Sequence, residues 1–214
     1  MCGRYALHAH PDVVALQFGL RSVPLFEPRY NIAPAARVLI VRNDGAALAR
    51  WGLVPGWAKA PSLSAKLNNA RAETVAQKAA FRDAYRKRRC LIPASGFYEW
   101  KAEGGGRQPY YVHPSQDPLF AFAGLWESWR GPEVVLETCA IITSAANEKM
   151  RAVHDRMPVI VAPQAYDRWL SPLEPDPRDL LVPFAAEPMR LWPVSARVNT
   201  PAHDDAGLLE TARW

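Results

Sequence analysis

Residues 89–100 read RCLIPASGFYEW, and this stretch predicts the class of fold. Residues 90–93 form a short apolar run of the kind found in buried strands, and residues 94–96 supply a small-residue turn. Aromatic residues then flank Glu99 in a second strand-like run. We therefore expect two short strands joined by a tight turn at the centre of the chain.

Runs of the same kind recur on both sides of this stretch. They are apolar, β-branched or aromatic, and turn-forming residues bound them. The further predicted strands are 37–41, 109–112, 119–123, 139–143 and 159–161. Residues 103–106 (EGGG) are predicted to form a hairpin tip. The 20 prolines, spread along the chain, favour many short elements joined by fixed turns.

Helical segments are fewer than strands. We predict helices at 11–18, 73–88, 164–170 and 178–182, of which 73–88 has the clearest helical spacing of apolar residues. The predicted fold class is therefore α+β. We expect one β-rich domain over residues 1–214, with a strand-dominated, barrel-like sheet and short peripheral helices.

The composition is that of a globular protein. Apolar residues make up 49% of the chain and charged residues 22%, which is enough for a substantial core. No apolar run reaches the length of a membrane span, and the N-terminus lacks a secretory signal, so a cytoplasmic location is expected, with nucleoid association when bound to DNA. The net charge of +5 permits a polyanionic partner, although many ordinary proteins share such a charge.

The three cysteines, Cys2, Cys90 and Cys139, are odd in number and widely separated. They make a poor disulfide framework, and no C-x-x-C spacing indicates zinc. A reducing compartment fits this pattern and would keep a working thiol available.

Cys2 is the most informative residue for function. If Met1 is removed, which the small second side chain favours, Cys2 carries an α-amine and a thiol on adjacent carbons. An α-amine has a pKa of about 7.7–8.0 against about 10.4 for lysine, so part of it is neutral and nucleophilic at physiological pH. An aldehyde attacked by the amine gives an imine, and the thiol then closes a thiazolidine ring. The opposing interpretation, favoured from this residue alone, is a frayed terminus.

Glu99 and His154 are candidate acid–base residues. Between two aromatic residues, the Glu99 carboxylate is open to desolvation, which raises its pKa and suits it to proton transfer; a strand-end glutamate facing water is the alternative. His154 precedes the apolar stretch 158–161 and titrates near neutral pH. Its alternative is a loop histidine held by Asp155.

Aromatic and basic residues are interleaved in a region rich in glycine and proline. Residues 50–59 contain Trp51 and Trp57, and residues 67–73 contain Asn69. Such a surface suits the bases and phosphates of an unpaired strand, whereas tryptophan in a core is the alternative. Asn69 precedes the predicted helix 73–88, where its side chain is suited to capping the helix or to orienting a ligand.

Together these stretches resemble the SRAP domain family, the SOS response-associated peptidases that are also described as abasic-site processing proteins. The likeness runs in the expected order from residue 1 to about residue 207. The segments that carry it are 1–5 (MCGRY), 29–34 (RYNIAP), 51–58, 69–74 (NARAET), 89–100, 123–127 (AGLWE), 141–143, 154–158 (HDRMP), 194–195 and 198–199.

The resemblance implies roles for individual residues. Cys2 is the crosslinking nucleophile after the loss of Met1, a loss often viewed in this family as self-processing. Asn69 orients the Cys2 adduct, Glu99 shuttles protons during imine formation and ring closure, and His154 helps to open the abasic sugar to its aldehyde. A further set is expected to line the DNA groove: Arg4, Asn31, Trp51, Trp57, Arg71, Thr143 and Arg156.

The function implied by the resemblance is that of an abasic-site sensor in the DNA-damage (SOS) response. Its Cys2 forms a covalent thiazolidine crosslink with the ring-opened abasic site in single-stranded DNA and so shields it. The expected partner is single-stranded DNA containing abasic sites, with replication-fork proteins as further candidates, and the expected state is a monomer. No metal and no cofactor are expected, because the sequence shows no ligand set and no phosphate loop. A strand-incising lyase activity stays open.

The sequence departs from the family pattern at two places. Ala58 stands where some members carry a second tryptophan, and residues 76–81 lack an expected proline.

Two alternative functions are kept beside this one. The first is a cysteine peptidase with Cys2, His154 and Asn69 as nucleophile, base and orienting residue, which turnover of a peptide in trans would indicate. The other is a noncovalent binder of single strands, from which DNA would detach under denaturing conditions.

Overall fold

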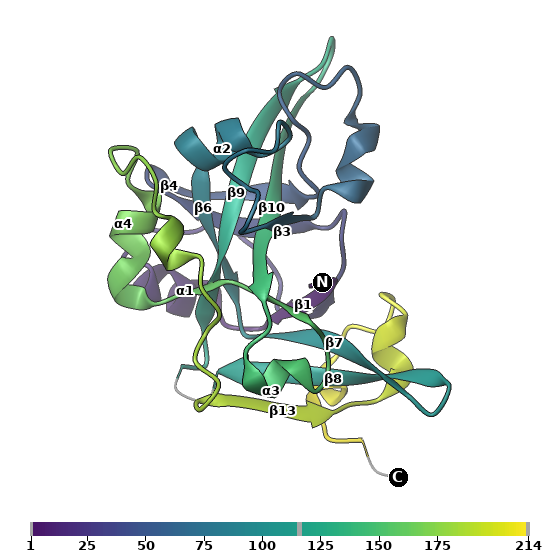
Figure 1. The fold of residues 1–214 in the computed structure, drawn as a ribbon. Coiled ribbons are helices and arrows are strands. Elements are labelled where there is room, and N and C mark those ends of the chain that lie inside the picture. The colour runs from purple at the N-terminus through teal and green to yellow at the C-terminus, as the bar shows by residue number, and fades with distance from the viewer. Residues whose placement is uncertain (1, 115–116, 213–214) are drawn as a thin grey trace.

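The computed structural model describes residues 2–114 and 117–212 and confirms a strand-rich α+β fold (Figure 1). The strands are β1 Arg4–Leu7, β2 Arg29–Ile32, β3 Arg37–Arg42, β4 Gly45–Trp51, β5 Asn69–Arg71, β6 Arg89–Ala94, β7 Gly96–Glu103, β8 Gly106–Pro114, β9 Phe120–Arg130, β10 Val135–Ala145, β11 Arg156–Pro158, β12 Ile160–Val161 and β13 Met189–Pro193. The α-helices are α1 Pro11–Gln17, α2 Arg82–Lys87, α3 Glu148–Arg151 and α4 Tyr166–Leu170. Short 3-10 helices are η1 Pro61–Lys66, η2 Pro163–Ala165, η3 Arg178–Leu180, η4 Ala196–Asn199 and η5 Ala206–Leu209.

Five strands close into a barrel. β3 pairs with β4 and β6, β6 with β9, and β9 with β10, and the parallel pairing of β10 with β4 completes the ring. Closure leaves no open edge among these strands, which accounts for the barrel-like sheet that the sequence predicts.

Alternate residues of the barrel strands enter two different cores. In β10, Cys139 and Ile141 belong to one hydrophobic cluster, whereas Ala140 and Ile142 belong to a second cluster that also contains residues of α2 and α4. Both faces of such a strand are buried, which is why these segments are continuous apolar runs in the sequence.

A second, antiparallel sheet has the order β13-β8-β7-β1-β2 and lies below the barrel in Figure 1. The β7–β8 hairpin turns at Gly104 and Gly105, whose φ angles of 58° and 81° suit glycine, and this confirms the predicted tip. β1 pairs with β7 in a register that sets Arg4 opposite Tyr98. The N-terminal strand is thereby placed beside the Glu99 segment.

One predicted helix is largely wrong. Residues 72–81 form a series of turns, and only Arg82–Lys87 of the segment 73–88 is α-helical. The Ala72 amide donates to the carbonyl of Thr143, so pairing with β10 holds this part of the chain extended before it turns. The side chains of Val75 and Phe81 are buried in the second cluster from these turns. Asn69 accordingly lies in a strand and caps no helix.

The other predicted helices appear in shortened form. Residues 11–18 contain α1, residues 164–170 contain α4 and the last two residues of η2, and residues 178–182 contain only the 3-10 turn η3. No helix in the described part of the chain is long and apolar enough to cross a membrane.

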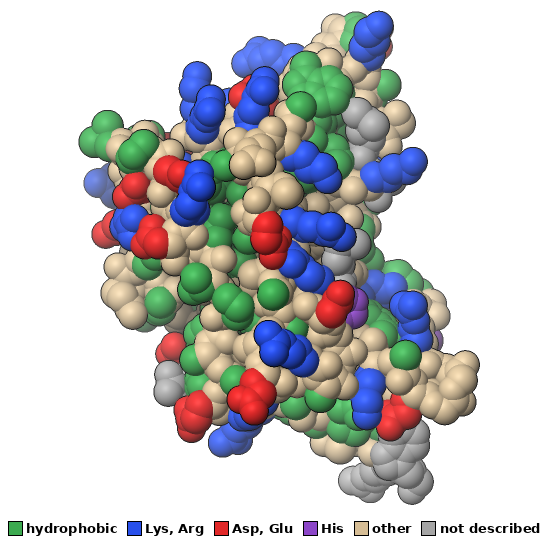
Figure 2. Space-filling model, in the orientation of Figure 1, with side chains coloured by type: hydrophobic (Ala, Val, Ile, Leu, Met, Phe, Trp, Pro, Cys, Tyr) green, Lys and Arg blue, Asp and Glu red, His purple; other side chains and the backbone are tan. Residues whose placement is uncertain are grey.

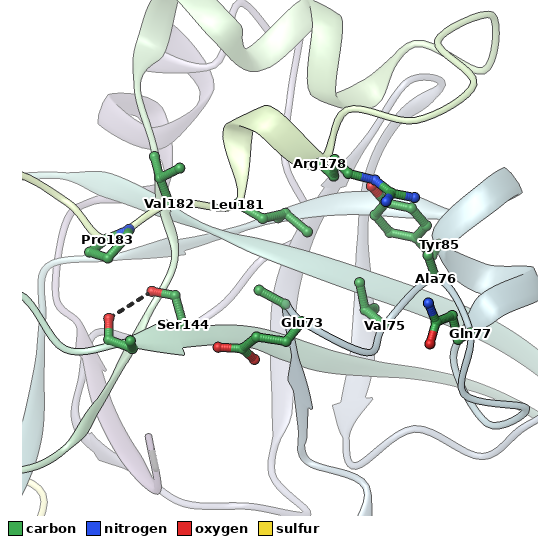
Figure 3. A pocket seen from close by; sticks show the side chains of 12 residues that line it. Glu73, Val75, Ala76, Gln77, Tyr85, Ser144, Arg178, Leu181, Val182 and Pro183 are labelled. Atoms are coloured by element: carbon green, nitrogen blue, oxygen red, sulfur yellow. Dashed lines mark hydrogen bonds between the residues drawn. The ribbon is translucent and has the colours of Figure 1, made fainter.

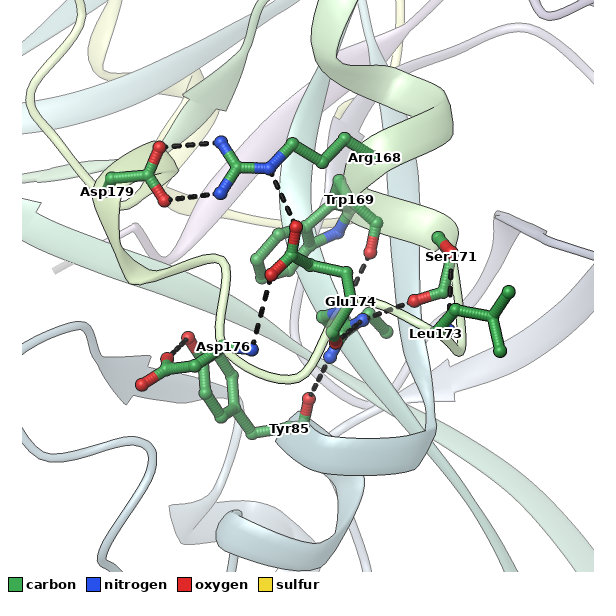
Figure 4. Close-up of polar contacts among 9 residues, drawn as sticks. Tyr85, Arg168, Trp169, Ser171, Leu173, Glu174, Asp176 and Asp179 are labelled. Atoms are coloured by element: carbon green, nitrogen blue, oxygen red, sulfur yellow. Dashed lines mark hydrogen bonds and ion pairs between the residues drawn. The ribbon is translucent and has the colours of Figure 1, made fainter.

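Arg89 ties α4 and the segment after it to the barrel. Its guanidinium is buried and donates to the carbonyls of Tyr85, Trp169 and Glu174. The Trp169 indole in turn donates to the carbonyl of Cys90. Figure 4 shows the adjoining surface network, in which Arg168 binds Asp179 and Glu174. The buried guanidinium needs these carbonyl partners, because an unsatisfied buried charge is costly.

Gly96 is the closest packed glycine of the second sheet. A Cβ at this position would lie 2.1 Å from the hydroxyl oxygen of Tyr111, whose ring is packed between Tyr98 and Trp192. We expect Gly96→Ala to lower the free energy of unfolding by about 3 kcal/mol, since overpacking forces this sheet apart. Urea unfolding measures the change. Gly106→Ala, which meets only ordinary contacts, is the control and should change stability by less than about 0.5 kcal/mol.

Candidate active site

The start of β1 is anchored by Asn69. The Asn69 Nδ2 donates to the carbonyl oxygen of Cys2 at 2.8 Å, and Cys2 is fully buried. β5 holds Asn69 in place, because this strand runs parallel to β10 with Asn69 opposite Ile141. Among the described residues, the buried Asn69 Oδ1 has no hydrogen-bond partner. It is therefore an acceptor available to a donor beside Cys2.

Glu99 lies on β7, the strand that pairs with β1, and is 2% exposed. Burial raises its pKa from the ordinary 4.5 to about 7. The charge of Asp155 acts in the same direction. A carboxyl group that titrates near neutrality can both donate and accept a proton, as acid–base catalysis requires.

The thiol of Cys2 is held in its neutral form. Burial raises its pKa, and the charge of Glu99 raises it further. A peptidase that attacks with a thiolate needs the opposite shift. The surroundings of Cys2 thus disfavour attack by a free thiolate.

His154 lies in the loop between α3 and β11. Its Nδ1 accepts from the backbone amide of Arg156 at 2.9 Å, and Asp155 Oδ1 is also 2.9 Å from this atom. The first contact requires an Nδ1 without a proton, whereas a hydrogen bond to the Asp155 carboxylate requires a protonated Nδ1. We favour the neutral ring with Nδ1 unprotonated, because burial lowers the pKa of His154. The amide then fixes the tautomer, and Nε2 carries the proton.

The predicted catalytic residues thus come from four separate segments. Asn69 binds Cys2 directly, Glu99 acts on the Cys2 thiol through its charge, and Asp155, adjacent to His154, acts on Glu99. The sequence separates these residues by tens of positions. The β1–β7 pairing sets the Cys2 segment beside the Glu99 segment, and the pairings of β10 with β5 and β11 set the segments of Asn69 and His154 on either side of β10.

Of the residues predicted to bind DNA, Trp57 and Arg71 are exposed. The Trp57 side chain is 61% exposed even though its indole donates to the carbonyl of Ala79, so a broad ring face is available for stacking. Lys and Arg side chains gather over the upper part and the centre of the face in Figure 2. Such a surface favours an anionic strand.

Three of the predicted DNA-binding residues, Asn31, Trp51 and Thr143, are buried, with at most 1% exposed. Asn31 Nδ2 donates to three backbone carbonyls of residues 198–203, and the Trp51 indole donates to the carbonyl of Asn68. The structure gives these side chains no direct access to a strand, because they serve as supports for neighbouring segments.

Arg4 and Arg156 are partly committed to other protein groups. Arg4 donates to Asn31 Oδ1 and to the carbonyls of Val198 and Asn199, so it fastens the C-terminal segment to β1. Arg156 donates to Glu73 and to the carbonyl of Thr143.

Glu73, Asn199 and Asp204 have no role in the sequence-based prediction, yet each contacts a residue predicted to bind DNA. Asn199 Oδ1 accepts from the indole of Trp100, and Asp204 accepts from the backbone amides of Tyr30 and Asn31. Each partner is distant in sequence, so no local pattern signals these contacts.

Trp51→Phe tests whether this residue acts as a support. The variant loses the hydrogen bond to the Asn68 carbonyl, next to Asn69, and we expect about 1 kcal/mol less stability. Binding of undamaged single-stranded DNA should stay unchanged, since the indole is buried, while any reaction at Cys2 slows several-fold. Fluorescence anisotropy measures binding, with Trp57→Ala as the contrast that weakens it. Weaker binding by Trp51→Phe would show direct contact.

In the part of the chain that the structure describes, no group of three or more His, Cys, Asp or Glu side chains is placed to hold a metal ion.

Comparison with known proteins identifies relatives that match most of the chain. A family model described as "SOS response associated peptidase (SRAP)" matches residues 1–201. The abasic site processing protein YoqW of Bacillus subtilis (strain 168) is 41% identical over 99% of this chain and 100% of its own. The abasic site processing protein YedK of Escherichia coli (strain K12) is 34% identical over 79% of each chain.

Solved structures share the fold. A crystal structure of a protein from Bacteroides thetaiotaomicron superposes with a TM-score of 0.91 and 26% identity, covering 99% of this chain and 100% of the other. A phage-related protein from Bordetella bronchiseptica gives 0.71 with 31% identity, over 90% of this chain and 94% of its own.

Proposed function

Because the chain belongs to the SOS response associated peptidase (SRAP) family, we propose that it processes abasic sites, by bonding covalently to them in single-stranded DNA through Cys2. Relatives with 34–41% identity are named abasic site processing proteins. The observation that carries the proposal is the placement of Cys2 between an amide that holds its carbonyl and a buried carboxyl with a pKa of about 7.

The reaction begins once Met1 is gone, through self-processing or another peptidase. The neutral ring of His154, with its proton on Nε2, donates to the sugar oxygen and favours the open aldehyde form. The α-amine of Cys2 attacks the aldehyde carbon, and Asn69 Oδ1 accepts a hydrogen bond from the amine or from the new hydroxyl. Asn69 thus orients the nucleophile through both ends of its amide.

Glu99 serves the two proton transfers that follow. As an acid it protonates the departing hydroxyl, so that one water leaves and the imine forms. As a base it takes the proton of the Cys2 thiol while sulfur adds to the carbon of the protonated imine, so that Glu99 regains its proton and the ring nitrogen keeps the hydrogen that it already carries. The product is a thiazolidine, and the whole reaction releases one water. A pKa of about 7 suits both steps.

The charge states of the site favour this chemistry over peptide hydrolysis. The raised pKa of Cys2 and the lowered pKa of His154 oppose a thiolate–imidazolium pair. A neutral thiol, by contrast, is sufficient for ring closure when a base stands beside it. We propose further that the protein acts as a monomer during the DNA-damage response, in the cytoplasm and at the nucleoid.

A denaturing gel tests the proposal. The protein lacking Met1 is mixed with a single-stranded oligonucleotide that carries one aldehyde-forming abasic site. A slower band of protein plus DNA is expected. It should be absent with an undamaged oligonucleotide and with a tetrahydrofuran analogue, which has no aldehyde. If no band forms, and a peptide is instead turned over in trans, the peptidase function replaces this one.

A further inference from the structure

The guanidinium fork of Arg156 is filled by a carboxylate. Nη1 donates to Glu73 Oε1 at 2.6 Å, and Nη2 donates to Glu73 Oε2 at 3.0 Å. Nη2 also donates to the carbonyl of Thr143 at 2.7 Å. Arginine binds phosphate with this same bidentate geometry. Glu73 therefore occupies the position that a phosphate group would take on Arg156.

The pair stands beside the Cys2 site. Arg71 is exposed and lies opposite Thr143 in the β5–β10 register. Because side chains alternate along a strand, Arg71 lies on the same side of β5 as Asn69, whose amide binds Cys2. Two arginines thus flank the site, and Glu73 offsets the charge of one of them.

The contact between Glu73 and Arg156 is easy to open. The Glu73 side chain is 51% exposed, so its carboxylate regains water when it leaves, which lowers the free-energy cost of opening the ion pair. Arg156 is 15% exposed and keeps its bond to Thr143, so the guanidinium stays in place. Glu73 also lines a cavity of about 320 Å³ together with Gln77 and Ser144, which gives the released side chain room to turn (Figure 3).

We propose that Glu73 competes with the DNA backbone phosphate for Arg156 and thereby keeps the noncovalent affinity for undamaged single strands low. The inference rests on the proposed function, since it takes the strand to pass Arg156 on its way to Cys2. Noncovalent affinity that is too high would detain the protein on lesion-free DNA. At an abasic site the covalent bond supplies the retention instead.

Binding of an undamaged, labelled oligothymidylate to the full chain tests the inference. Fluorescence anisotropy is recorded for the wild type and Glu73→Gln between about 50 and about 200 mM salt. Glu73→Gln is expected to bind several-fold more tightly at the lower salt. The plot of log K against log salt should steepen by about 0.7, the value for one added phosphate contact to a single strand. Glu73→Ala should behave in the same way.

Two controls separate this competition from a general gain of positive charge. Glu27→Gln removes the same charge from an exposed position between α1 and β2 and should leave affinity and slope at the wild-type values. In an Arg156→Met background, Glu73→Gln should lose its effect, because the competition acts through Arg156. An effect of Glu73→Gln that persists in that background overturns the inference.

An affinity of Glu73→Gln equal to or below that of the wild type, including no measurable binding by either, also overturns it. Reduced affinity would mean that Glu73 orients Arg156 for the phosphate. Covalent attachment to the abasic oligonucleotide is measured on the same preparations. Failure of the proposed function appears there as a missing adduct in the wild type, whatever the binding data show.

Discussion

Replacing Cys2 with alanine is expected to abolish the adduct that survives denaturation. The variant keeps an α-amine once Met1 is lost, and so it still forms an imine with the aldehyde. An imine hydrolyses when the protein unfolds, because no thiol is present to close the ring. The loss of adduct on a denaturing gel should be complete, whereas binding of undamaged DNA stays near the wild-type level.

Borohydride distinguishes imine formation by the α-amine of residue 2 from ring closure by the Cys2 thiol. Reduction of the imine during the reaction should restore a covalent band for Cys2→Ala, since the reduced amine no longer hydrolyses. The preparation must be shown by mass to lack Met1. A band that survives without borohydride would place the bond on a different residue and contradict the assignment of the thiol.

Glu99→Gln is expected to slow adduct formation by about 10²-fold or more, the usual contribution of a positioned acid–base group. The glutamine amide fills the same space but cannot exchange a proton. The rate should be measured under single-turnover conditions across a series of pH values. The wild-type profile should contain a titration near pH 7 that Glu99→Gln lacks. An unchanged profile in the variant would remove Glu99 from the proton transfers.

The stability of Glu99→Gln provides an independent control on that pKa. With a pKa raised from 4.5 to about 7, folded Glu99 binds more protons than unfolded Glu99 between these values. Wild-type stability should therefore fall as pH rises through this window, by at most about 3 kcal/mol. Glu99→Gln should lack this decline and gain on the wild type at pH 8. If urea unfolding gave the wild type and Glu99→Gln the same dependence of stability on pH, the pKa of Glu99 would not be raised in the folded protein.

The barrel could be predicted from the sequence because its strands are buried on both sides. The segments 90–93 and 139–143 are apolar at every position or nearly so, and they appear as β6 and β10. The helix at 73–88 could not be judged in the same way. Its apolar spacing is helical, yet pairing of residues 69–72 with β10 fixes how the chain enters the segment. Tertiary contacts of this kind override local preference.

The candidate site shows a similar division. The chemistry of Cys2 and Glu99 can be predicted from short segments of sequence. Cys2 is a thiol beside the N-terminus, and Glu99 is a carboxylate between two aromatic residues. The burial of Trp51 and Asn31 cannot be predicted in this way, since aromatic and polar residues near a basic loop occur both on binding surfaces and as buried residues that support neighbouring segments. The Arg156–Glu73 contact joins positions 83 residues apart, and only the fold brings them together.

The intact mass of the crosslinked species shows whether Cys2 carries the bond to DNA. One adduct is expected, with a mass equal to that of the protein without Met1 plus the abasic oligonucleotide, less one water. Digestion should place the DNA on the peptide that begins at Cys2, with neither a free amine nor a free thiol at that residue. An adduct that retains Met1, or one attached to a lysine or to an internal cysteine, would rule out a thiazolidine at Cys2.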